Sequence, residues 1–244
     1  MKIKIYEDEY KLGAAAAEHA AEVVRKAIKK DGCCRIVLST GASQFTFFDG
    51  FVRQKIDWSK VEMFHLDEYM GISDTHKASF CAYLKQRFIS RVGALKAAHL
   101  IDGLAKPSLT IERLSAELRG GPIHLGLIGI GENGHIAFND PPADFEDESA
   151  FKVVSLDEDC KRQQVREGWF ESVETVCRQA ITMTCRQIME CGTIISVVPF
   201  AVKAQAIKKT IQSKDINPAI PATILKEHGD FNLYLDKNSA SLIS

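Results

Sequence analysis

The sequence lacks the features that define several protein classes. Its seven cysteines are an odd number and include no Cys-x-x-Cys pair, which argues against a disulfide framework and against a zinc site. No apolar run approaches the length of a membrane span, and residues 1–6 alternate apolar and charged side chains without a signal-type core. We therefore expect no metal, mostly buried and unreactive thiols, and a cytoplasmic location.

An excess of one charge is also missing. Lysine and arginine total 31 against 32 aspartate and glutamate residues, the net charge is -1, and no block of basic residues occurs. Nucleic acids and anionic membranes are bound by clustered positive charge, so neither is an expected partner. A small phosphorylated ligand needs only a local pocket and remains compatible with this composition.

The chain is long enough for one large domain, because 244 residues of which 45% are hydrophobic can bury a sizeable core. No internal repeat, low-complexity tract or linker divides residues 1–244. Periodicity predicts helices over residues 8–30, 79–92, 108–118, 158–170 and 218–228, and strands at 35–38, 61–66, 100–101, 151–155, 193–198 and 231–235. Strands that alternate with helices predict a single α/β domain with a mainly parallel sheet and helices on both faces.

Residues 123–142 organise the chain. Their first half is an apolar run bounded by Pro122 and by glycines, which is typical of a strand buried on both faces of a parallel sheet. Their second half gathers glycines, His135 and Asp140 into one turn. Ligands of open α/β sheets bind beyond the carboxyl ends of the strands, so we interpret this turn as the reactive loop of an enzyme.

The same loop contains the spacing G-x-G-x-x-G at Gly129, Gly131 and Gly134. In dinucleotide-binding folds the last glycine opens a helix whose amides face the pyrophosphate. Here Pro141 and Pro142 follow too soon for such a helix, because they lack amide donors and restrict the residues before them. We therefore expect no nicotinamide or flavin cofactor, and we expect the glycines to let the backbone bend sharply beside a ligand.

Two other predicted strands end in candidate ligand groups. The first is followed by a turn of small and polar residues that leads into a helix and leaves free amides and hydroxyls for an anion: Ser39, Thr40, Gly41, Ala42, Ser43 and Gln44. Capping of that helix by Ser43 would use the same donors and is the alternative. The second strand runs straight into Asp67 and Glu68, which favour a functional loop, with turn or cap roles also open.

These motifs resemble those of the glucosamine-6-phosphate deaminase (isomerase) family. The matching segments are residues 64–71, which read F-H-L-D-E-Y-M-G, residues 129–141, and Lys203 after a strand, in order over nearly the whole chain. The sister 6-phosphogluconolactonases carry a D-G-H-T-A-S-like loop that this sequence lacks. The resemblance implies a Rossmann-like sheet and a cofactor-free conversion of a hexosamine 6-phosphate, first of all glucosamine 6-phosphate, to a ketose phosphate and ammonia.

The resemblance also implies roles for single residues. Asp67 matches the carboxylate that moves a proton between C1 and C2, and His135 matches the imidazole that opens the sugar ring, with Asp140 as its carboxylate partner. These roles agree with the chemistry, since each step needs a group that can exchange protons near neutral pH. The substrate- and phosphate-binding positions are Ser39, Thr40, Gly41, Ala42, Ser43, Gln44, Gly134 and Lys203.

Several positions depart from the family pattern. Asn133 stands at a catalytic position where many members have Asp, and an amide cannot act as a general base; Asp140 is one methylene shorter than the commoner Glu. Arg162 and Arg166 are both candidates for the family's phosphate-binding arginine. The positions of the allosteric site of some members are not recognisable, so we expect no activation by an acetylated amino-sugar phosphate.

Other functions stay open from the sequence. The substrate could have galacto rather than gluco stereochemistry, and a lactonase-like hydrolase would use the same fold without proton transfer at C2. A non-catalytic sugar-phosphate sensor would keep the turn at 39–44 and Lys203 but would need neither Asp67 nor His135. The presence of both side chains favours an enzyme. A homo-oligomer is also compatible with the sequence.

Overall fold

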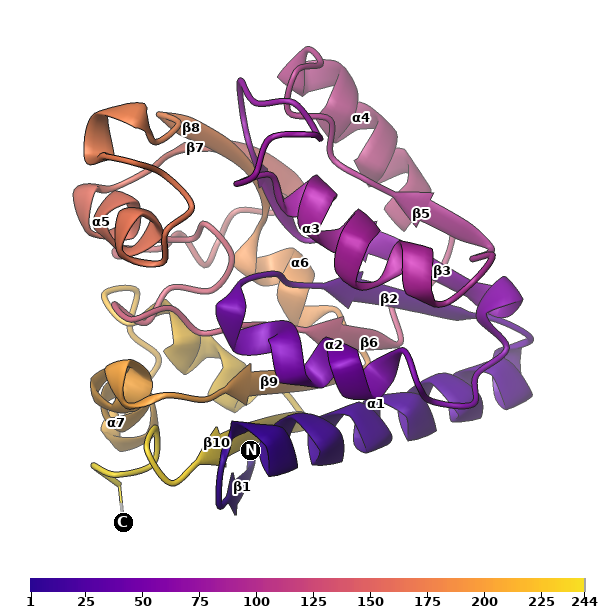
Figure 1. Cartoon of the computed structure of the whole chain (residues 1–244), viewed down its shortest axis with the longest axis horizontal. Coiled ribbons are helices and arrows are strands. Elements are labelled where there is room, and N and C mark those ends of the chain that lie inside the picture. The colour runs from indigo at the N-terminus through magenta and orange to yellow at the C-terminus, as the bar shows by residue number, and fades with distance from the viewer. Residues whose placement is uncertain (244) are drawn as a thin grey trace.

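The computed structural model describes residues 1–243, which form two sheets and the helices around them (Figure 1). The helices are α1 (Glu9–Asp31), α2 (Phe45–Phe51), α3 (Phe80–Arg87), α4 (Pro107–Leu118), α5 (Glu158–Arg166), α6 (Cys185–Met189) and α7 (Ala204–Gln212). The larger sheet contains β1 (Lys2–Tyr6), β2 (Cys34–Leu38), β3 (Val61–His65), β5 (Ala97–His99), β6 (Leu125–Leu127), β9 (Thr193–Val198) and β10 (Phe231–Asp236). The smaller sheet contains β4 (Asp67–Tyr69), β7 (Phe151–Ser155) and β8 (Gln179–Met183).

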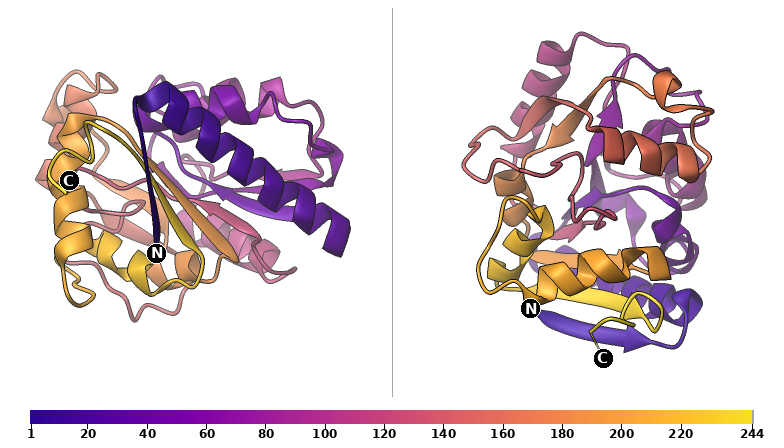
Figure 2. Two further views of the ribbon diagram at one scale, coloured as in Figure 1. Left: turned by 90° about the horizontal axis from the view of Figure 1, so that it is seen from below. Right: turned by 90° about the vertical axis from the view of Figure 1, so that its left-hand side faces the viewer.

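The larger sheet is parallel throughout and has the strand order β1-β10-β9-β6-β2-β3-β5. Alternate residues of a strand point to opposite faces. Thus Ile36 and Leu38 pack with α1 and α2, whereas Val37 packs in the cluster that includes residues of α4, α6 and α7. Figure 2 shows the long helix α1 lying along one face of the sheet. The predicted α/β domain with helices on both faces is confirmed.

The strand order places a ligand crevice beside β2 and β6. After β2 the chain turns to β3 and β5 on one side, and after β6 it turns to β9 and β10 on the other. The connections that leave these two neighbouring strands therefore diverge, and such a switch point is where open α/β sheets bind ligands. The N–H of Ser39 donates to the carbonyl of Leu127 (3.0 Å), so the turn after β2 begins against the reactive loop after β6.

The smaller, antiparallel sheet was not predicted. Its strand β4 begins at Asp67, one residue after β3 ends, and pairs with β8 so that Asp67 lies opposite Thr182. A three-residue strand carries no periodicity, and its partner is more than a hundred residues away, so the segment reads as a loop in the sequence. The consequence is that Asp67 lies at the junction of two sheets.

Three other elements differ from the prediction. The helix expected over residues 218–228 is a 3-10 helix, Pro221–Glu227. Its start is held by the Thr223 hydroxyl, which donates to the carbonyl of Ile220 (2.7 Å) and accepts the N–H of Asn217 (2.7 Å). Residues 100–101, expected as a strand, lie just after β5, which ends at His99, and β1 was not predicted. All seven cysteines are free and five are buried. Over residues 1–243, no helix is long and apolar enough to span a bilayer.

Candidate active site

A pocket of about 260 Å³ opens at the switch point of the larger sheet. This volume is close to the lower end of the range for ligand sites, about 300 Å³, and suits a small ligand. The sequence-predicted residues that line it are Ser39, Thr40, Gly41, Ala42, Ser43, Asp67, His135 and Lys203. Four chain segments that are far apart in sequence therefore meet around one cavity.

Asp67 is buried in the wall of this pocket. Its Oδ1 accepts no hydrogen bond within the described chain. Burial, and to a smaller extent the charge of Glu68, raises the pKa of the Asp67 carboxyl to about 8. A carboxyl that titrates near neutral pH can both take up and release a proton, as an acid-base group must.

The neighbouring Glu68, in contrast, accepts hydrogen bonds at both of its carboxylate oxygens. Its carboxylate accepts four hydrogen bonds at 2.7 to 3.1 Å, from the N–H groups of Tyr69, Phe80 and Cys81 and from the hydroxyl of Ser79. Phe80 and Cys81 begin α3, whose N–H groups lack partners within the helix. Of the two adjacent carboxylates, Glu68 therefore fixes the start of α3, whereas Asp67 is left to the pocket.

The ring of His135 is held from behind by polar side chains. Its Nδ1 lies 2.7 Å from Oδ1 of Asn133 and 3.3 Å from Oδ1 of Asp140. Burial, followed by the charge of Lys203, lowers the pKa of His135 to about 4, so the imidazole is neutral at physiological pH. An amide oxygen can only accept, so Nδ1 donates and Nε2 keeps its lone pair. Asn133 and Asp140 support His135 but do not line the pocket.

Gly131 leaves the space that the imidazole occupies. A Cβ at this position would lie 2.2 Å from Cε1 of His135, which is far inside van der Waals contact. Gly134 has a φ of +90° and packs against Ile220 instead of lining the pocket. Residues 131–142 form turns and no helix, so the G-x-G-x-x-G spacing does not create a dinucleotide site.

The turn at residues 39–44 presents its backbone to the pocket. Gly41 has a φ of +109°, which residues with a side chain rarely adopt. It immediately precedes the 3-10 helix Ala42–Gln44. Ser43 does not cap α2; its Oγ accepts a hydrogen bond from Nε2 of Gln44 (2.8 Å), so the capping alternative is wrong. Gln44 also donates to the carbonyl of Val197 (3.0 Å) and does not line the cavity.

Lys203 is a buried ammonium group. Only 6% of the residue is exposed, and it forms no ion pair or side-chain hydrogen bond within residues 1–243. Burial lowers the pKa of Lys203, while Glu167 and Glu132 oppose that shift. A buried, unpaired cation at a pocket is suited to bind an anion, because burial of a charge is costly until a partner is supplied.

Two pocket residues other than glycine have positive φ angles: Ala137 (51°) and Phe200 (84°). They are the only such residues in the described part of the chain. Each costs about 1 to 3 kcal/mol and persists only where the surroundings enforce it. At Phe200 the buried carboxylate of Asp236 does so by accepting the N–H at 3.1 and 3.3 Å, immediately before the turn that carries Lys203.

The sequence predicted a helix over residues 158–170 but, apart from two candidate arginines, did not assign its residues to the pocket. Helix α5 and the residues after it contribute Gln163, Gln164, Arg166, Glu167 and Trp169 to the lining. Of the two candidate arginines, Arg166 lines the pocket and forms an ion pair with Glu132, whereas Arg162 does not line the pocket and pairs with Asp159; both side chains are more than half exposed. The available signal was the pair of adjacent glutamines in a mostly charged helix.

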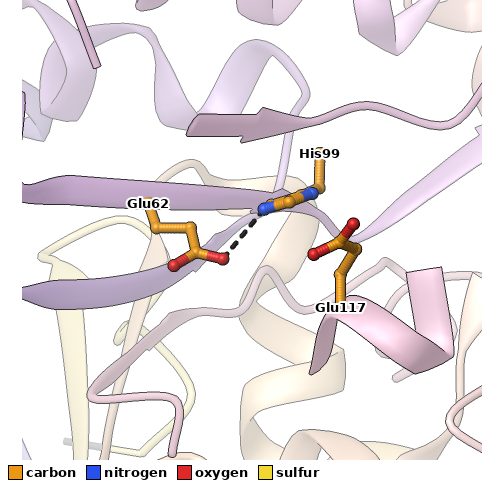
Figure 3. Close-up of side chains that lie close together, drawn as sticks. All are labelled: Glu62, His99 and Glu117. Atoms are coloured by element: carbon orange, nitrogen blue, oxygen red, sulfur yellow. Dashed lines mark hydrogen bonds and ion pairs between the residues drawn. The ribbon is translucent and has the colours of Figure 1, made fainter. Parts of the chain in front are cut away.

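A second group of ionisable side chains lies near the start of β3. Oxygen and nitrogen atoms of Glu62, His99 and Glu117 lie within 4.8 Å of one another, and His99 points toward both carboxylates (Figure 3). Glu62 bonds His99 (2.9 Å) and also pairs with Arg35 (3.4 Å) and Lys96 (3.7 Å). Two cations already balance this carboxylate, so we interpret the group as an ion-pair network that joins β2, β3, β5 and α4.

Comparison with known proteins identifies relatives over nearly the whole chain. The family model for glucosamine-6-phosphate isomerases/6-phosphogluconolactonase matches residues 7–233. A glucosamine-6-phosphate deaminase of Thermoanaerobacter sp. (strain X514) is 34% identical over 234 residues, covering 93% of this chain and 90% of the relative. The corresponding protein of Oceanobacillus iheyensis is 31% identical over 252 residues, covering 100% and 97% of the two chains.

Solved structures extend the comparison to the fold. A monomeric glucosamine-6-phosphate deaminase has a TM-score of 0.89 at 25% identity and covers 99% of this chain and 100% of its own. The 6-phosphogluconolactonase of Thermotoga maritima has a TM-score of 0.79 at 16% identity, with coverage of 97% and 99%, and shares the fold. This chain therefore belongs to the glucosamine-6-phosphate isomerase/6-phosphogluconolactonase family.

Proposed function

We propose that this protein is an isomerising deaminase that converts glucosamine 6-phosphate to fructose 6-phosphate and ammonia. The observation that carries the proposal is the combination in one pocket of an unpartnered Asp67 carboxyl, a neutral His135 imidazole and an unpaired Lys203 ammonium. The relatives named glucosamine-6-phosphate deaminase support the choice of substrate. Seven free thiols favour a reducing compartment, and we propose the cytoplasm as the site of action.

Binding fixes the positions of both ends of the substrate, the phosphate and the sugar. Lys203 and the amides of residues 40–43 hold the phosphate, because a cation and free N–H groups are its complementary partners. Arg166 lines the same pocket and can join them if its pair with Glu132 opens. This arrangement directs the sugar toward Asp67 and His135, so the reacting carbons lie beside the acid-base groups.

The chemistry divides into ring opening and isomerisation. Nε2 of His135 takes the proton of the anomeric hydroxyl and returns it to the ring oxygen, which breaks the bond from C1 to the ring oxygen. The ionised Asp67 carboxylate then removes the proton from C2, a C1–C2 double bond forms, and the former carbonyl oxygen takes up a proton that the C2 ammonium group releases. Return of the Asp67 proton to C1 gives a ketimine, which water hydrolyses to the ketose and ammonia. Each proton transfer needs a group within hydrogen-bond reach of the substrate.

Asn133 cannot exchange protons as a carboxylate at the same position could, so the proton-transfer steps are distributed differently among the residues of the site. Its Oδ1 accepts the N–H of His135 (3.0 Å) and contacts Nδ1 (2.7 Å), so we propose that it orients the ring without exchanging protons. Asp140 is then the one carboxylate that contacts the imidazole, and it balances the positive charge that develops on His135 during ring opening.

The test is an ammonia-release assay with glucosamine 6-phosphate, galactosamine 6-phosphate and mannosamine 6-phosphate, run beside 6-phosphogluconolactone hydrolysis. We expect release of ammonia, with the highest kcat/KM for the gluco substrate. A preference for the galacto substrate would change the stereochemistry but keep the mechanism. Lactone hydrolysis without ammonia release would favour the hydrolase, and binding of every sugar phosphate without turnover would favour a sensor.

A further inference from the structure

Two adjacent glutamines of α5 line the pocket, but only one of the two side chains has hydrogen-bond partners within the protein. Gln163 is used within the protein, since its Oε1 accepts the N–H of Glu132 (3.5 Å) and its Nε2 donates to the carboxylate of Glu167 (2.7 Å). Gln164 is only 6% exposed, and its buried Oε1 accepts no hydrogen bond from residues 1–243. Both side chains border the cavity, so only Gln164 has an acceptor left for a ligand.

The position of this unpartnered oxygen is informative. Buried polar atoms in folded proteins almost always have a partner, so each exception needs an explanation. Two other pocket residues, Ser39 and Asp67, also have buried side-chain oxygens without partners. Three buried oxygens without partners therefore border this one cavity, as is expected of a site whose missing donors belong to the ligand.

We propose that Gln164 is a substrate-recognition residue whose Oε1 accepts a hydrogen bond from an O–H or N–H group on the sugar part of the substrate. This inference rests on the proposed function. An amide oxygen only accepts, and the oxygens of an ionised phosphate are acceptors too, so the phosphate cannot supply the partner. A hexosamine 6-phosphate carries suitable donors along its sugar, namely its hydroxyl groups and its ammonium group.

The variant Gln164→Met tests the proposal because methionine keeps the length and helix propensity of the side chain and removes the acceptor. We expect KM for glucosamine 6-phosphate to rise roughly threefold to tenfold with kcat nearly unchanged, as for a contact made equally in substrate and transition state. The inhibition constant of inorganic phosphate should stay unchanged. Lys161→Met, on the same helix but outside the pocket, is the control and should leave KM unchanged.

Stability separates recognition from a structural role. Gln164→Met removes no hydrogen bond of the protein and should melt at or above the wild-type temperature, whereas Gln163→Met removes two and should melt lower. Glucose 6-phosphate, tested as an inhibitor, then identifies the donor. If Gln164→Met weakens it as much as the amino sugar, the donor is a hydroxyl; if it does not, the donor is the ammonium.

Three results would overturn the inference. One is an unchanged KM in Gln164→Met, and another is a parallel loss of affinity for inorganic phosphate, which would place the side chain at the phosphate. A melting temperature as low as that of Gln163→Met would also reject it, because the oxygen would then have a partner within the protein. Failure of the proposed function is a different result, since wild-type protein would then release no ammonia at all.

Discussion

The replacements Asp67→Asn and Glu68→Gln should have opposite effects on stability although the two residues are adjacent. The pKa of Asp67 is raised from 3.8 to about 8 by burial and by Glu68, so the folded protein holds a proton that the unfolded chain releases. Stability therefore falls as the pH rises from about 4 to about 8 and is constant above that range. An amide is neutral at every pH and avoids this loss.

The size of the effect follows from the shift in pKa. A pH of 7 lies about three units above the unfolded pKa of 3.8. Each unit corresponds to about 1.4 kcal/mol, so the stability gained by Asp67→Asn has an upper limit of about 4 kcal/mol. For a chain of this length that limit corresponds to roughly 10 °C in melting temperature. At pH 5 the gain should shrink to about 1.5 kcal/mol, because only about one unit remains.

Glu68→Gln removes one of two carboxylate oxygens that each accept two hydrogen bonds. Two buried donors then face an NH₂ group, at a cost of about 1 to 3 kcal/mol each. Thermal melts of both variants and of wild type at pH 5, 6, 7 and 8 measure the contrast, and ammonia release measures activity. We expect Asp67→Asn to lose about 10²- to 10⁴-fold in kcat. Equal destabilisation of both variants at every pH would refute the assignment of Asp67 to the pocket.

Three further variants test the rest of the site. Lys203→Ala should raise KM for the phosphorylated sugar roughly 10- to 100-fold and abolish discrimination against free glucosamine; unchanged selectivity would return Lys203 to a structural role. Gly131→Ala should lower kcat about 100-fold with inorganic phosphate binding retained, because the new Cβ displaces the ring of His135. Asn133→Asp should raise the pKa of His135 above about 4, as followed by NMR titration of the imidazole, because a negative charge then faces Nδ1; a constant pKa would contradict the contact.

The sequence predicts the parts of this protein that depend on local pattern. The parallel strands β2, β3 and β9 are short apolar runs, and α1 has helical apolar spacing, so periodicity identifies them. The smaller sheet depends on pairing of β4 with β8 across more than a hundred residues, which no local pattern encodes. The sequence could not show which of Asp67 and Glu68 faces the pocket for the same reason. The answer depends on where the N–H groups at the start of α3 lie.

The helix over the pocket illustrates a different limit. A helix that packs on a core shows an apolar stripe, and that stripe is what periodicity detects. Helix α5 buries Cys160, Gln163 and Gln164, and both glutamines line the pocket. Two of these three buried residues are polar, so the spacing of apolar residues does not show that this face of the helix is covered. The turn at residues 39–44 was predictable because its small residues follow a strand directly.

Several features of the pocket lower the stability of the fold. Ala137 and Phe200 have strained backbones, Lys203 is a buried charge without a partner, and Asp67 and Gln164 have buried oxygens without donors. Each of these costs lowers the stability of the free protein, and a sugar phosphate can offset the last three by supplying an anion and hydrogen-bond donors. A ligand that binds only the folded state stabilises it in proportion to the logarithm of its saturation. The unpartnered groups that lower the stability of the free protein are therefore also the groups that would bind the ligand. A variant that removes one of them should change both the stability of the protein and its affinity for the substrate.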